Sequence, residues 1–254
     1  MNRWWFPVLS AAFIVALSNA CSGDDGAETD TDGAPTQVNT PVATALGLTS
    51  IDLESLPAAV LSEAPGYTEK ESTAEQLSAA REMFAAQFAD DLEGDLEGFR
   101  LLWFLKPDVI ADHPHAPNGT LLVEFGTVLS DYAPRLLPLM EGMQETGLTD
   151  FGAELQERYN AGSIEEVDEA TELGDCGWGL KIMIDGGEMS SVAGSSVEFP
   201  DLPFTMLVFV RNNALVKISA YYDAGLYPMA VARAVDTALV KAVREAPADA
   251  TNGQ

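Results

Sequence analysis

The sequence FTMLVFVRNNALVKISAYY, residues Phe204–Tyr222, predicts a β-hairpin. Apolar, aromatic and β-branched residues fill both arms, Phe204–Val210 and Ala214–Tyr222, and such runs favour strands. Arg211-Asn212-Asn213 indicates a tight turn between the arms, because asparagine tolerates the positive φ that hairpin turns demand. We therefore expect two antiparallel strands near the C-terminal end of the folded region.

Three earlier stretches are also predicted as strands. Phe99–Leu105 (FRLLWFL) is continuous and aromatic, and Gly179–Asp185 (GLKIMID) is followed by two glycines. Asn118-Gly119 indicates a turn into TLLVEFGTVLSD. In that stretch alternate residues share one face at a period of two: Val123, Phe125, Thr127 and Leu129.

Helical spacing occurs between these strands. Ser72-x-x-Glu75 has the pattern of a capping box. The apolar residues after it recur every three or four positions: Leu77, Ala80, Phe84 and Phe88. Tyr132–Glu145 and Leu226–Val243 are further predicted helices, whereas Phe151–Asp168 is interpreted as a short helix and an acidic loop.

Antiparallel strands with amphipathic helices predict an α+β fold, in which helices pack mainly on one face of an antiparallel sheet. Leu122–Pro134 can be aligned with Leu215–Pro228 with one gap. This similarity has two interpretations, a duplication into two ββα-like halves and a chance match. We expect one α+β domain over residues 43–246 and a disordered tail over residues 247–254.

Residues 1–20 have the layout of a secretory signal peptide. Arg3 supplies a positive charge, an apolar run extends from Trp4 to Leu17, and Ser18-Asn19-Ala20 offers a cleavage site. The run has about 14 residues, whereas a membrane-spanning helix needs about 20. We therefore expect this segment to be removed on export.

Cys21 follows the predicted cleavage site directly, and this arrangement resembles a bacterial lipoprotein, whose first mature residue is a lipid-modified cysteine. Ser18-x-Ala20 also fits an ordinary cleavage site, which would give a soluble secreted or periplasmic protein instead. Residues 21–42 contain many Gly, Asp and Thr and few aliphatic residues. Such a composition predicts a disordered acidic linker between the lipid and the domain.

The folded region also resembles small extracytoplasmic lipoproteins of Gram-positive and actinobacterial type. Three short motifs before the terminal hairpin and helix carry this resemblance: Leu56-Pro57, Gly66-Tyr67 and Leu173-Gly174-Asp175. The resemblance implies no reaction, because many such proteins have no assigned role.

The charge of the chain limits its partners. It has 40 acidic and 13 basic residues, for a net charge of −27. A surface this negative repels phosphate backbones, which excludes nucleic acid as a partner. It also repels anionic lipid head groups, so attachment to a membrane requires the lipid at Cys21.

Asp112-His113-Pro114-His115 is a candidate site for Zn²⁺ or Cu²⁺, and it contains both histidines of the chain. Imidazoles two residues apart on an extended segment point the same way and suit Zn²⁺ or Cu²⁺, with Asp112 as a third ligand. The alternative interpretation is a solvated, proline-rich loop without a metal.

No catalytic residue is assigned from the sequence. A nucleophilic Cys176 would need a base and a lowered pKa, whereas the neighbouring Asp175 would raise that pKa. The chain has no G-x-S-x-G, phosphate-binding or H-E-x-x-H motif. Trp178, Tyr67 and Tyr227 lie near predicted element ends and would either line a pocket or join the core.

The sequence thus predicts a lipid-anchored extracytoplasmic protein of the cell envelope. Its domain would bind a small ligand or an envelope protein without catalysis. Two alternatives are a Zn- or Cu-binding lipoprotein that uses Asp112, His113 and His115, and an unrecognised hydrolase.

Overall fold

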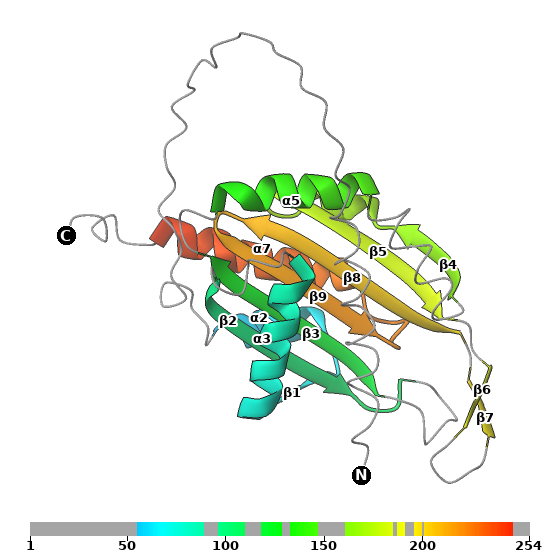
Figure 1. The fold of residues 1–254 in the computed structure, drawn as a ribbon. Coiled ribbons are helices and arrows are strands. Elements are labelled where there is room, and N and C mark those ends of the chain that lie inside the picture. Colours follow the sequence, from blue (N-terminus) through cyan, green and yellow to red (C-terminus); the bar gives the residue numbers. More distant parts are fainter. Residues whose placement is uncertain are drawn as a thin grey trace, which may run out of the picture.

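The computed structural model describes residues 55–88, 96–109, 118–128, 133–146, 161–184, 187–190, 196–199 and 201–245. These residues form the predicted α+β fold (Figure 1). The elements are, in chain order, α2 (Ser55–Glu63), β1 (Thr68–Lys70), α3 (Ala74–Phe88), β2 (Leu96–Lys106), β3 (Gly119–Val128), α5 (Ala133–Thr146), β4 (Ala161–Glu166), the 3₁₀-helix η3 (Asp168–Glu172), β5 (Cys176–Ile184), β6 (Gly187–Ser190), β7 (Ser196–Phe199), β8 (Leu202–Arg211), β9 (Ala214–Tyr221) and α7 (Pro228–Glu245).

Seven of the described strands form one sheet in the order β1-β2-β3-β9-β8-β5-β4, and every neighbouring pair is antiparallel. β3 and β9 lie side by side at its centre, with Val123 opposite Ile218 and Phe125 opposite Val216. β6 and β7 pair with each other outside this sheet. The Ser- and Gly-rich sequence of this stretch predicts a loop, whereas the structure has a small hairpin here.

The β8–β9 hairpin is confirmed. Arg211 is opposite Ala214 across the turn, and Asn212 has the positive φ of 56° that the turn demands. The next residue, Asn213, is buried, and its side-chain amide donates a hydrogen bond of 2.9 Å to the Val128 carbonyl. The Val128 N–H donates in return to the Asn213 carbonyl at 3.0 Å. The turn is therefore fixed to the end of β3 as well as closing its own hairpin.

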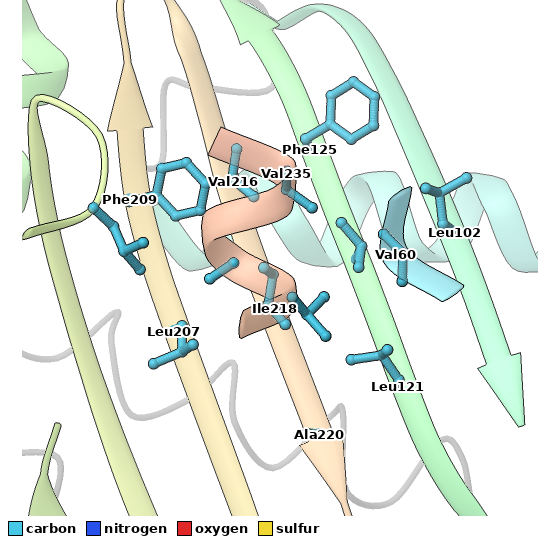
Figure 2. Close-up of a cluster of buried hydrophobic side chains, with 14 of the residues drawn as sticks. Val60, Leu102, Leu121, Phe125, Leu207, Phe209, Val216, Ile218, Ala220 and Val235 are labelled. Atoms are coloured by element: carbon cyan, nitrogen blue, oxygen red, sulfur yellow. The ribbon is translucent and has the colours of Figure 1, made fainter. Parts of the chain in front are cut away.

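α2 and α7 pack on one face of the sheet (Figures 1 and 2). Figure 2 shows Val60 of α2 and Val235 of α7 among side chains of β2, β3, β8 and β9. The members from the sheet include Leu102, Leu121, Phe125, Leu207, Phe209, Val216 and Ile218. Burial of one such side chain contributes roughly 1.5–3 kcal/mol to folding, so this core is a main source of stability.

α3 and α5 pack on the opposite face. Their buried residues share a second core with side chains of β5, β8 and β9, among them Phe84, Leu136, Met140, Trp178, Val208 and Leu215. The described helices are thus divided between both faces, which corrects the expectation that they pack mainly on one. The physical reason is visible in β3, a central strand in which every residue is buried. Successive side chains of a strand point to opposite faces of the sheet, so both faces of β3 are covered.

The similarity between the two halves extends to the strands. The β2–β3 and β8–β9 hairpins meet through β3 and β9. A two-fold axis between β3 and β9, perpendicular to the sheet, would place both following helices on the same face. Instead α5 belongs to the core that contains Val128, and α7 to the core that contains Val216. The two helices therefore lie on opposite faces of the sheet and do not match a two-fold repeat.

The cap of α3 lies one residue later than Ser72 and Glu75 predict. The Thr73 N–H donates to Gln76 Oε1 at 2.9 Å, and the Gln76 N–H donates to Thr73 Oγ1 at 3.2 Å. Both residue pairs match the capping-box pattern, but only Thr73 directly precedes the first helical residue, Ala74. The predicted apolar face is confirmed, with Phe84 and Phe88 buried.

Several strands differ from the sequence-based expectation. β2 begins at Leu96, whose backbone pairs with Val128 across a bulge, and not at Phe99. β5 begins at Cys176 and not at Gly179. Residues 161–166 form the edge strand β4 where an acidic loop was predicted, because charged residues are common on edge strands and resemble a loop in sequence.

No helix in the described part of the chain combines the length and the apolar character that crossing a bilayer requires.

Candidate functional site

Cys21, Asp112, His113 and His115 lie outside the described residues. The lipidation and metal predictions therefore stay predictions. Among the described residues, no group of three or more His, Cys, Asp and Glu side chains is arranged to hold a metal ion.

Cys176 is the first residue of β5 and is half-buried, with a free thiol. Burial raises the pKa of this thiol, and the negative charge of Glu141 on α5 raises it further. The direction agrees with the sequence-based expectation, but the responsible carboxylate is Glu141 and not the neighbouring Asp175. A thiol with a raised pKa is mostly protonated at neutral pH and is a poor nucleophile.

The three aromatic residues considered for a pocket do not come together. Trp178 is buried in the core under α3 and α5, whereas Tyr67 is buried in the core under α2 and α7, on the other side of the sheet. Tyr227 is 50% exposed, and its hydroxyl donates a hydrogen bond to Glu169. These positions do not support a shared pocket.

A polar network surrounds the motif Leu173-Gly174-Asp175. Arg211 Nε and Nη2 donate to the two carboxylate oxygens of Asp236 on α7, at 2.8 Å each. Arg211 Nη1 also donates to Asp175 Oδ1 at 2.6 Å. These carboxylates raise the pKa of the Arg211 guanidinium, chiefly through its hydrogen bonds to Asp236.

The same network holds backbone groups. The Asn212 N–H donates to Asp175 Oδ2 at 2.6 Å, and the Gly174 N–H donates to Asp236 Oδ2 at 3.3 Å. The β8–β9 turn, the η3–β5 connection and α7 are thereby joined at one end of the sheet. No pattern in the sequence indicates that Arg211 pairs with Asp236. The network has a structural role, because its hydrogen bonds hold these three segments together.

A second cluster lies at the other end of β9. Lys106 Nζ at the end of β2 forms an ion pair of 2.9 Å with Asp223 Oδ2, and the side chain of Asp223 is only 7% exposed. Asp223 Oδ1 accepts a hydrogen bond of 2.9 Å from the Gly225 N–H. The Lys106 ammonium also lies 5.7 Å from the centre of the Tyr67 ring, within cation–π range.

Burial raises the pKa of Tyr67 well above its ordinary value, and the Asp223 carboxylate raises it further. Tyr222, directly before Asp223, has a φ of 68°, which is rare for a bulky residue. Asp108, two residues after Lys106, has a φ of 55°. Unusual backbone conformations of this kind are costly and concentrate at functional sites.

This cluster lies where β2 ends and β3 begins. A Cβ atom placed on Gly119 would lie 2.7 Å from Val109 Cγ1 and 3.0 Å from the Tyr67 hydroxyl. The described residues on each side of positions 110–117 therefore lie beside Tyr67. We define Tyr67, Lys106 and Asp223 as the sheet-end cluster and take it as the candidate functional site. No pattern in the sequence indicates that these three residues meet, although Tyr67 belongs to the motif Gly66-Tyr67.

A third charged pair lies within the sheet. Glu124 of β3 and Lys217 of β9 are directly opposite, and their side chains form an ion pair of 2.7 Å with 6% and 13% exposure. They lie on the face that carries α3 and α5, because the adjacent Val123 and Ile218 belong to the opposite core. Such a pair sets strand register more than it adds stability.

No protein-family model, no curated protein and no solved structure matches this chain. We therefore infer its function from its own residues.

Proposed function

We propose that this protein is a lipid-anchored domain of the bacterial cell envelope that binds a ligand or a partner protein without catalysing a reaction. The observation that carries the proposal is the N-terminal sequence, in which Arg3, an apolar run and small residues precede Cys21. The strongly negative charge supports the lipid as the means of attachment, because the rest of the chain would be repelled by anionic lipids.

The described cations and the described thiol do not form a catalytic arrangement with one another. Lys106, Arg211 and Lys217 are each engaged by carboxylates. Cys176, the thiol among the described residues, has a raised pKa. None of these described groups combines a nucleophile with an adjacent base, which is the arrangement that covalent catalysis requires.

Within this proposal, the sheet-end cluster is the contact surface. Lys106 is a partly exposed cation at 30% side-chain exposure, and the left-handed backbone of Tyr222 and Asp108 lies next to the ion pair. Exposed Asn118 marks the same end of β3. A partner that approaches this end would meet Lys106 in an otherwise acidic protein.

Photo-crosslinking in intact cells tests this surface. A photoreactive amino acid at Asn118 is expected to give a crosslinked adduct of defined mass. The matched control is the same amino acid at Glu141, which is exposed on α5. Equal adducts from both positions, or none from Asn118, would argue against the sheet-end cluster as the contact surface for a protein partner.

One feature of the structure favours metal binding as an alternative function. The segment with Asp112, His113 and His115 connects β2 to β3, and Gly119 at the start of β3 adjoins the side chain of the buried carboxylate Asp223. Titration of the purified protein with Zn²⁺ and Cu²⁺ separates the two functions. Metal binding that is lost in a His113→Ala/His115→Ala variant would favour this alternative, and equal binding by parent and variant would eliminate it.

The hydrolase alternative is tested by a broad screen with esterase and glycosidase substrates. We expect no turnover of any of these substrates. Any turnover that survives purification to homogeneity would overturn the non-catalytic assignment.

A further inference from the structure

We draw no further inference here: the strongest candidate, the strip of sheet around the Glu124–Lys217 ion pair on the face that carries α3 and α5, is buried, and nothing in the described part of the chain shows what covers it.

Discussion

At the scale of single residues, Gly174 shows why the motif Leu173-Gly174-Asp175 has a glycine. Its φ is +65°, and a Cβ atom there would collide with the Val210 carbonyl. We expect Gly174→Ala to lower the free energy of unfolding by about 2 kcal/mol or more, because left-handed backbone is unfavourable for residues with a Cβ. Urea unfolding followed by circular dichroism measures this change.

Gly142 is the matched control for that substitution. It lies inside α5, and a Cβ atom there would meet nothing within 4 Å. Gly142→Ala should therefore raise the free energy of unfolding by roughly 0.5–1 kcal/mol, the helix-propensity difference between the two residues. Similar effects of the two substitutions would contradict the backbone assigned to Gly174.

Tyr222 makes stability depend on pH in the alkaline range. Burial raises its pKa to about 12, whereas a tyrosine in the unfolded chain ionises near pH 10. The contribution of the protonated Tyr222 hydroxyl to the free energy of unfolding is therefore fully present below about pH 10. It is lost as the pH rises toward 12, by up to about 2–3 kcal/mol.

The Tyr222→Phe variant tests this contribution. It should lose less stability than the parent between pH 9 and pH 11.5, because phenylalanine has no proton to release. The measurement is urea unfolding of both proteins at each pH. An identical loss in parent and variant would show that Tyr222 does not titrate as described.

At the scale of elements, two overlapping capping boxes at the start of α3 can be distinguished by substitution. Thr73→Ala removes an observed cap and should cost about 1 kcal/mol. Ser72→Ala should change stability little, because the buried Ser72 hydroxyl has no hydrogen-bond partner in the described residues. Thermal unfolding of the two variants measures the difference. A larger loss for Ser72→Ala would favour the box predicted from the sequence.

The elements that could be predicted are those with strong local signals. Apolar runs and an asparagine turn identify β8 and β9 without any knowledge of their neighbours. β4 was missed because Glu165 and Glu166 on an exposed edge strand resemble a loop. The predicted start of β5 lies three residues after its actual start, because glycines such as Gly177 are unfavourable in strands in general. At this position a glycine is required, since a Cβ atom would collide with the Ala170 carbonyl.

The division of helices between the two faces depends on tertiary packing and not on local pattern. β3 reads GTLLVEFGTV, and this nearly continuous apolar run is typical of a strand that is covered on both faces. That signal was available in the sequence. It could not show which helix covers which face, since α5 and α7 follow equivalent hairpins and pack on opposite sides.

At the scale of the whole molecule, the sheet-end cluster could not be predicted from the sequence. Tyr67, Lys106 and Asp223 come from three distant parts of the chain, and no spacing connects them. Only the order of strands places the end of β2 beside the residue that follows β9. The signal for export at Cys21, in contrast, is contained in one continuous segment.

The net charge of the full chain, −27, predicts how the stability of the protein responds to salt. Repulsion among acidic groups destabilises the compact state, and added salt screens it. We expect Tm to rise by a few degrees between about 0.01 M and 0.5 M NaCl, because acidic residues outnumber basic ones by 40 to 13. A fall in Tm would mean that ion pairs such as Lys106–Asp223 outweigh the repulsion.

We propose that the mature protein begins at a lipid-modified Cys21. Mass spectrometry of the N-terminal peptide from membrane-extracted protein tests it most directly, with Cys21→Ser as the control that should abolish both the modification and membrane retention. The expected result is a peptide that starts at Cys21 and carries the mass of attached acyl chains. An unmodified peptide that starts at Cys21 would contradict lipid modification of this residue.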